Sequence, residues 1–305
     1  GDDAAVLSPS EAARVITTDV LVEGVHFSDR TTPPESVGWR AIAANLSDFA
    51  AMGATPSGVT VGLALPGTVA VAWVERVYQG MAACLTAYGG TILGGDVVRS
   101  AQTTLAITAI GSVPPQRVLR RDRAQPGQVI VATGLHGAAR GGLELLLHPE
   151  RGQGLPVTTR DALIRAHQRP VPRFDVVARL TALADEDFPT LGGMDSSDGL
   201  ANAVLYLCQA SGVGAQLRRS RLPLAPSLKA WVGATTALEW GLYGGEDFEL
   251  ILTLPAETAL EILPDLGPSA AIVGTVEADT AVLLVDDVTH TPPLTLTWEN
   301  CFQHF

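Results

Sequence analysis

Lysine is almost missing from this sequence, and its scarcity excludes two common phosphate-handling sites. Lys229 is the only lysine among 20 basic residues, so the other nineteen are arginines. It lies between Pro226 and Trp231, outside any glycine-rich loop. A Walker A loop requires GxxxxGK[ST], and a protein kinase requires a lysine on a strand. The chain therefore contains neither a P-loop nor a protein-kinase site.

Cysteine is also scarce, and the sequence lacks several catalytic motifs. Cys84, Cys208 and Cys301 are isolated, odd in number and never arranged as CxxC. This pattern argues against disulfides and a thiolate zinc site, and it fits a reducing cytoplasm, where we place the protein. The motifs HExxH, GxSxG and GxGxxG are absent as well. Their absence removes the sequence evidence for a zinc protease, an α/β-hydrolase or a Rossmann dinucleotide site.

Positive charge is in deficit, and long apolar runs are missing. The formal net charge is -12, so there is no electrostatic case for binding nucleic acid or anionic lipid, and we expect neither partner. No apolar run approaches the length of a membrane span, and no signal peptide is visible. The first residues, Gly1-Asp2-Asp3, read as the middle of a motif. We therefore expect the natural chain to begin upstream.

The sequence is long and apolar enough to form two domains. Its 305 residues are 47% hydrophobic, a composition typical of well-packed soluble proteins. Helical and strand-like patterns are mixed along its length, and Val113-Pro114-Pro115 is the best candidate for a domain boundary. We predict an α/β protein with an N-terminal domain at residues 1–113 and a C-terminal domain at residues 114–305.

The stretch between Pro34 and Gly53 predicts a helix that carries a carboxylate at the edge of a core. Proline precedes its first turn, Gly53 follows its last, and apolar residues recur at helical spacing between them. Asp48 lies beside the apolar stripe, so we expect it to be half-buried and to need a partner. Nearby in the sequence only Arg40 is available, although a solvated Asp on an amphipathic helix would explain the pattern as well.

The other predicted elements alternate between strands and helices. A loop at residues 133–137 precedes a helix whose N-terminus could face an anion, but an ordinary strand-to-helix turn fits equally well. The predicted strands are residues 15–18, 59–65, 91–93, 103–113, 129–132, 248–254, 270–276 and 281–285, and the further helices are residues 69–88, 174–184 and 200–210 and one that ends at Leu147.

Acidic residues recur in glycine-rich or helix-flanking positions. Each has an ordinary explanation: Asp195 or Asp198 can cap a helix, Gly95-Asp96 can form a turn, and Asp19 can end a strand. It is much less probable that all five acidic groups have only such structural roles. Hard oxygen ligands without His or Cys favour Mg²⁺, and adjacent glycines let backbone N–H groups approach phosphate. The groups are Asp2-Asp3, Asp19, Asp48, Gly94-Gly95-Asp96 and Asp195-Ser196-Ser197-Asp198.

Several long motifs are spread over nearly the whole chain: Gly1-Asp2-Asp3-Ala4-Ala5, Thr17-Thr18-Asp19, Glu23-Gly24-Val25-His26-Phe27, residues 45–53, Gly94-Gly95-Asp96, residues 195–200 and Gly244-Gly245-Glu246-Asp247-Phe248-Glu249-Leu250. Together they resemble the thiamine-monophosphate kinase family, in the superfamily of aminoimidazole ribonucleotide synthetase and selenophosphate synthetase. The resemblance implies a two-domain fold, with an N-terminal mixed sheet with helices and a C-terminal α+β domain. It also implies a homodimer whose N-terminal sheets join.

The resemblance also implies an activity and a set of site residues. The activity is Mg²⁺-dependent transfer of the γ-phosphoryl group of ATP to thiamine monophosphate, and the catalytic residues are Asp48, Asp96, Asp198 and Arg121. ATP contacts are Gly95, Asp96, Arg121 and Ser197, and substrate contacts are His26, Glu246 and Trp298. The Mg²⁺ ligands, direct or through water, are Asp3, Thr17, Thr18, Asp19, Asp48, Asp96, Asp195 and Asp198.

Three departures from the family pattern lie near the substrate contacts. Tyr243 stands where serine is usual, Phe248 replaces a tyrosine, and the tail from Trp298 to Phe305 is one residue longer than expected.

The chemistry of the implied reaction explains why no His-Asp pair is required. The acceptor phosphate is already largely ionised, since its second pKa is about 6, so transfer needs no protein base. Two alternatives remain: another ATP-dependent synthetase of the superfamily, and a nucleotide-binding protein without catalysis. Selenide chemistry expects a Cys and a Lys in an N-terminal glycine-rich loop, and the sequence has neither there. Nucleotide binding without turnover would favour the non-catalytic alternative.

Overall fold

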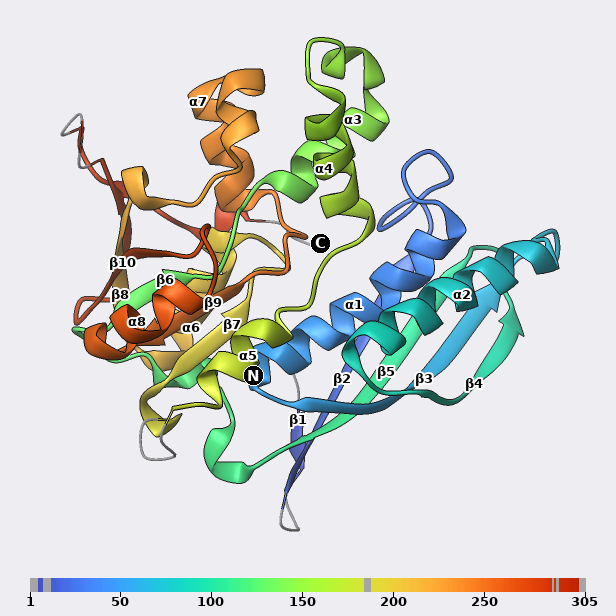
Figure 1. The fold of residues 1–305 in the computed structure, drawn as a ribbon, viewed down its shortest axis with the longest axis horizontal. Helices are drawn as coiled ribbons and strands as arrows, with labels where there is room; N and C mark the ends of the chain where they lie inside the picture. The colour runs from blue at the N-terminus through green and yellow to red at the C-terminus, as the bar shows by residue number, and fades with distance from the viewer. Residues whose placement is uncertain (1–4, 8–11, 184–187, 287, 289–290, 302–305) are drawn as a thin grey trace.

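The described part of the chain forms two β-sheets with helices packed on them (Figure 1). The computed structural model describes residues 5–7, 12–183, 188–286, 288 and 291–301. The first sheet has the strand order β1-β2-β5-β3-β4, and the second has the order β12-β11-β8-β10-β6-β9-β7. This arrangement confirms the predicted mixed α/β class.

The first sheet is antiparallel except at one edge. There β4 pairs in parallel with β3, whereas the other neighbouring strands run in opposite directions. Inward-facing residues of β5 alternate with partly exposed ones, as expected for a sheet that has one face against a core. The strands are β1 (Ala5–Leu7), β2 (Ala13–Val22), β3 (Thr55–Leu65), β4 (Ile92–Arg99) and β5 (Thr104–Val113).

Two long helices, α1 (Pro34–Met52) and α2 (Val71–Tyr88), cover one face of this sheet (Figure 1). Their backbones approach each other closely at a pair of glycines. A Cβ on Gly38 would overlap the carbonyl oxygen of Val77, and one on Gly80 would overlap that of Glu35. Only glycine therefore permits this crossing of the two helices.

The second sheet is also mostly antiparallel, with one parallel pair between β8 and β11. Among the described residues, no helix is long and apolar enough to cross a bilayer. The strands are β6 (Val129–Ala132), β7 (Gly192–Asp195), β8 (Gly214–Arg218), β9 (Leu250–Leu254), β10 (Ala271–Glu277), β11 (Val282–Val285) and β12 (Leu294–Thr295). The helices are α3 (Ala138–Leu147), α4 (Val157–Gln168), α5 (Phe174–Leu180), α6 (Leu200–Ser211), α7 (Pro226–Tyr243) and α8 (Ala256–Ile262).

Short 3-10 turns connect these elements: η1 (Pro115–Arg117), η2 (Arg121–Arg123), η3 (Pro149–Gly152), η4 (Phe188–Thr190), η5 (Arg219–Arg221), η6 (Leu263–Asp265) and η7 (Trp298–Asn300).

Helix α1 belongs to both halves of the molecule. Leu46 and Phe49 pack into the core beneath the first sheet, whereas Ala50 and Ala51 pack with residues of the second half such as Val131. Figure 1 shows α1 running through the middle of the molecule, between the first sheet and the β7 edge of the second. The helix predicted between Pro34 and Gly53 is confirmed, with Pro34 as its first residue, and it places Asp48 where the two halves meet.

Several local predictions were wrong. Gly94, Gly95 and Asp96 form no loop, because they lie inside β4. Pairing with β3 overrides the poor strand propensity of glycine, and a Cβ on Gly95 would overlap the carbonyl oxygen of Val61. The predicted helix at residues 174–184 ends at Leu180. The pattern analysis also missed β8, α4 and α7, and α7 is interrupted at Gly233, whose φ is 80°.

Candidate active site

A cavity of about 970 Å³ opens where the two halves meet. Its walls come from β2 and the loop that follows it, from α1, α3, α4 and α7, and from the loops after β7 and before β9. Six of the predicted site residues line it: Thr18, Asp19, His26, Ser197, Asp198 and Glu246.

Asp195 lies at the acidic part of this site but is itself almost completely buried, at 1% exposure. Its carboxylate accepts hydrogen bonds from Ser47 Oγ at 2.6 Å and Ser197 Oγ at 3.1 Å. Thr17 donates its hydroxyl to the carboxylate of Asp48. The acids of β2 and α1 therefore lie close to those at the end of β7, although β7 is far away in the sequence.

The carboxylates of Asp19, Asp195 and Asp198, which form the acidic end of the site, repel one another. Burial, and then the charges of Asp195 and Asp198, raise the pKa of Asp19 to about 6. Burial also raises the pKa of Asp195, to which Asp198 contributes, although hydrogen bonds from Ser47 and Ser197 oppose it. Oδ2 of Asp19 is buried without a hydrogen-bond partner. Buried anions this close together need a counter-charge, and a divalent cation would supply it.

The donor set fits Mg²⁺ bound partly through other ligands. Among the described residues, no three His, Cys, Asp or Glu side chains are close enough to form a ligand set by themselves. Mg²⁺ usually keeps several waters and binds one or two carboxylates together with substrate phosphates, so an incomplete protein set is the ordinary case. Asp3, a predicted ligand, lies outside the described residues.

The loop before β9 is held in an unusual backbone conformation. Glu246 has a φ of 61° and Phe248 a φ of 52°, a region that side-chain-bearing residues seldom occupy. The backbone N–H of Glu246 donates to the carbonyl oxygen of Ser197 at 2.6 Å, which ties this loop to the Asp198 loop. Three carboxylates of the loop, described below, anchor it to three other parts of the fold.

The first anchor is Glu246, which is bound by Arg40 of α1. Arg40 Nη2 donates to Glu246 Oε1 at 2.6 Å and to the carbonyl oxygen of His26 at 3.2 Å, and Nη1 donates to the carbonyl oxygen of His167 at 2.5 Å. Arg40 was the only cation that the sequence offered near Asp48, but its guanidinium binds Glu246 instead. Arg40 and Asp48 are both on α1, but Arg40 points to a carboxylate 206 residues away.

His167 completes this cluster, and sequence analysis missed it. Its Nδ1 lies 3.5 Å from Glu246 Oε2, and the residue is buried at the end of α4. Burial and the charge of Arg40 lower the pKa of His167 to about 4, so the imidazole is neutral at neutral pH. Burial tends to raise the pKa of Glu246, but the charge and the hydrogen bond of Arg40 outweigh burial, and the pKa is lowered. Glu246 is therefore a carboxylate whose charge Arg40 already neutralises.

The second anchor is Asp247, which caps α3. Its carboxylate accepts from the backbone N–H of Gly137 at 2.6 Å and of Ala139 at 2.8 Å. The N-terminus of this helix was expected to face an anion or to be an ordinary turn, and the anion is a side chain of the protein itself. Burial raises the pKa of Asp247 to about 7, although the two N–H groups oppose the shift.

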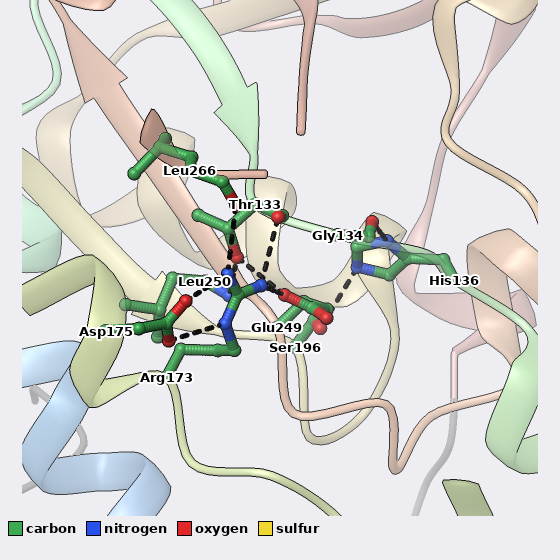
Figure 2. Close-up of polar contacts among 9 residues, drawn as sticks. All are labelled: Thr133, Gly134, His136, Arg173, Asp175, Ser196, Glu249, Leu250 and Leu266. Carbon is green, nitrogen blue, oxygen red and sulfur yellow. Dashed lines mark hydrogen bonds and ion pairs between the residues drawn. The ribbon is translucent and has the colours of Figure 1, made fainter. Parts of the chain in front are cut away.

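The third anchor is Glu249, which pairs with Arg173 (Figure 2). Its Oε2 also accepts from Thr133 Oγ1 at 2.7 Å, and Arg173 donates to both carboxylate oxygens of Asp175 at 2.9 and 2.8 Å. In the same view, His136 Nε2 lies 3.1 Å from Ser196 Oγ. The loops that carry Asp198 and Glu246 are thus both fixed to the segment that leads into α3.

Seven of the predicted site residues that the structure describes do not line this cavity. Three of them, Thr17, Asp48 and Asp195, make the hydrogen bonds given above, and the other four follow. Gly95 and Asp96 lie on the exposed edge strand β4. The guanidinium of Arg121 lies over the ring of Tyr206, at 5.4 Å from its centroid. Trp298 contacts the same tyrosine, with centroids 4.6 Å apart. Their roles towards ATP and substrate stay predictions.

Comparison with known proteins assigns the family. Models of the N-terminal and C-terminal domains of AIR synthase related proteins match residues 1–113 and 125–286. The thiamine-monophosphate kinase of Synechococcus elongatus is 46% identical over 308 residues, covering 100% of this chain and 91% of that protein. The chain belongs to the thiamine-monophosphate kinase family. The Escherichia coli K12 member is 36% identical with the same coverages, 100% and 91%.

Solved structures of the thiamine-monophosphate kinase family share the fold. The structure of AaThiL complexed with AMPPCP and TMP is 33% identical, has a TM-score of 0.81 and covers 97% of this chain and 90% of that one. Hydrogenase maturation protein HypE is only 21% identical, with a TM-score of 0.76 over 97% of this chain and 91% of that one, and so shows the fold alone. The predicted two-domain aminoimidazole ribonucleotide synthetase-like fold is confirmed.

Proposed function

We propose that the cavity binds thiamine monophosphate and that its acidic end binds Mg²⁺ together with the phosphates of ATP. As a member of the thiamine-monophosphate kinase family, the chain is an ATP-dependent kinase that phosphorylates thiamine monophosphate to thiamine diphosphate. The observation that carries the proposal is the convergence of Asp19, Asp195 and Asp198 at one end of a cavity large enough for a small organic substrate.

The test is to incubate purified protein with ATP and thiamine monophosphate and to follow thiamine diphosphate and ADP. We expect both products in equal amounts, dependent on Mg²⁺. Labelled ATP alone should leave no label on the protein, because direct transfer to the acceptor phosphate passes through no phosphoenzyme. ATP binding without product would contradict the proposed activity, and a labelled protein would contradict direct transfer.

Catalysis in this proposal is alignment and charge neutralisation. Mg²⁺, when bound, neutralises phosphate oxygens and so allows two anions to approach. The metal ligands we propose are Asp3, Thr17, Thr18, Asp19, Asp48, Asp96, Asp195 and Asp198, of which Asp48, Asp96 and Asp198 also act in catalysis. Because the acceptor phosphate is ionised at neutral pH, the cavity needs to orient it rather than deprotonate it.

The nucleotide and substrate contacts are proposals as well. We assign Gly95, Asp96, Arg121 and Ser197 to ATP, and His26, Glu246 and Trp298 to thiamine monophosphate. The cavity supports the assignment of His26, Glu246 and Ser197, because all three line it. A crystal structure with both ligands would test each contact, and density for substrate outside the cavity would contradict the assignment.

We further propose a homodimer in which residues 1–113 provide the interface and, with residues 114–305, the nucleotide and substrate site. The edge strand β4 supports this, since Leu93, Val97 and Val98 are 56%, 61% and 50% exposed. An apolar unpaired edge favours pairing with another chain. Sedimentation equilibrium at micromolar concentration tests the proposal, and a monomer would contradict it.

A cytoplasmic location is proposed from the cysteines. Cys84, Cys208 and Cys301 are all buried and free, as expected for a reducing compartment. Fractionation of cells that produce the protein tests the location, and recovery with the membrane or periplasm would contradict it.

Arg121→Lys is expected to weaken the use of ATP by about 1 to 3 kcal/mol, the scale of a charge-assisted hydrogen bond. A guanidinium makes two parallel bonds to phosphate that an ammonium does not reproduce. The controls are Arg117→Lys and Arg123→Lys, which should change kcat/KM for ATP little. Equal effects at all three positions would mean that Arg117, Arg121 and Arg123 act only as diffuse surface charge.

Arg40→Lys is expected to raise KM for thiamine monophosphate about tenfold, the scale of losing 1 to 2 hydrogen bonds to charged or carbonyl oxygens. Arg40 joins three cavity walls, and an ammonium cannot reach all three acceptors. The matched control is Arg76→Lys, which alters another Arg–Glu pair, at 2.5 Å from Glu35, away from the cavity. Equal changes of KM for both substrates in Arg40→Lys would point to a general loss of structure instead.

A further inference from the structure

The charged side chains that line the cavity are paired with one exception. Apart from Asp19 and Asp198 at the acidic end, these residues are Arg40, Arg140, Glu239 and Glu246. Arg40 is paired with Glu246, as described, and Arg140 Nη2 lies 2.9 Å from Glu144 Oε2. Among the described residues, Glu239 has no hydrogen bond and no ion pair. The remaining carboxylate is therefore available to a ligand.

Glu239 lies on α7, where the cavity opens to solvent. It is exposed and lines the cavity, and so does the next residue, Trp240, which is 8% exposed. Exposed carboxylates are ionised at neutral pH. Arg140, which also lines the cavity, lies over the Trp240 ring at 4.9 Å from its centroid and is bound to Glu144, which Arg151 also contacts. Glu239 on α7 thus presents to an entering ligand a carboxylate that has no ion-pair partner among the described residues.

We propose that Glu239 is a specificity-determining residue that recognises the cationic thiazolium ring of the substrate. The proposal rests on the function proposed above, and it assigns the counter-ion of that ring to a residue outside the shared motifs. Glu246 is a poorer counter-ion, because Arg40 at 2.6 Å already cancels its charge and a second cation would be repelled by the guanidinium. Substrate would then lie with its phosphate towards Asp19 and Asp198 and its cation towards Glu239.

The alternative is that Glu239 is an ordinary solvated surface carboxylate. A ligand pair that differs in a single charge separates the two explanations. The ligands are thiamine monophosphate and its analogue in which a neutral thiophene ring replaces the thiazolium. Calorimetry without ATP then measures both dissociation constants for the unmodified protein, Glu239→Gln, Glu239→Lys and the control Glu261→Gln, which removes an exposed carboxylate that does not line the cavity.

We expect Glu239→Gln to weaken the binding of thiamine monophosphate about three- to fivefold, the scale of an exposed ion pair. Glu239→Lys should weaken this binding about tenfold or more. Binding of the neutral analogue should change little in Glu239→Gln, and Glu261→Gln should leave both ligands unaffected. The charge effect should shrink as the salt concentration rises.

Two results would overturn the proposal: unchanged binding of thiamine monophosphate in Glu239→Gln, or equal weakening of both ligands. Unchanged binding in a protein that still forms thiamine diphosphate overturns this inference alone. A failure of the unmodified protein to form product, with the charge-dependent difference in binding intact, overturns the proposed activity but supports the role of Glu239.

Discussion

Replacing Asp48 by asparagine is expected to lower turnover by at least about 10²-fold while the fold remains intact, the scale of losing one preorganised electrostatic group. Asparagine has the shape of aspartate and can still accept the hydroxyl of Thr17 through its amide oxygen. What it removes is the negative charge that α1 carries to the junction of the two halves.

The measurement is kcat for formation of thiamine diphosphate over a range of Mg²⁺ concentrations, with thermal unfolding as the check on structure. Asp161→Asn on α4 is the matched control, since that aspartate is exposed and outside the cavity, and its kcat should be unchanged. Near-normal turnover of Asp48→Asn with unchanged dependence on Mg²⁺ would rule out a metal site shared by this acid.

Replacing Gly38 by alanine is expected to destabilise the protein by about 3 kcal/mol or more, at the upper end of the cost of overpacking a core. The expected change in the free energy of unfolding is opposite to what helix propensity predicts, since Gly→Ala inside an unobstructed helix stabilises by about 1 kcal/mol. The added Cβ would overlap the carbonyl oxygen of Val77, and backbone atoms cannot move aside as the end of a side chain can. Helices α1 and α2 would have to separate.

Denaturant unfolding gives the change in the free energy of unfolding. The control is Gly154→Ala, because nothing lies within 4 Å of a Cβ there, and we expect a change within about 0.5 kcal/mol. Gly80→Ala should repeat the effect of Gly38→Ala, because its Cβ would overlap the carbonyl oxygen of Glu35 on the facing helix. An increase in stability on Gly38→Ala would mean that the helices pack farther apart than described.

Local sequence patterns predicted a structural feature correctly where all the residues that determine the feature lie in one stretch of the chain. The helix between Pro34 and Gly53 was predicted from the prolines before it, the glycine after it and apolar residues at helical spacing, and α1 differs only in including Pro34. The long motifs around Asp19, Asp195 and Glu246 were enough to assign the family and its activity. Local patterns failed at Gly94-Gly95-Asp96, because a parallel partner strand, not the local sequence, decides that this segment is extended.

The sequence by itself determined the mixed α/β class, the helix that carries Asp48 and the family, because each depends on spacing along the chain. Only the tertiary structure decided which charges meet. Arg40 pairs with Glu246 across 206 residues, Asp247 caps a helix that begins 109 residues earlier (247 − 138), and Glu239 has no ion-pair partner in the part of the chain that the structure describes. A charge pair has no periodicity along the sequence, because it depends on where distant segments come to lie, so the sequence could not show that Arg40 meets Glu246.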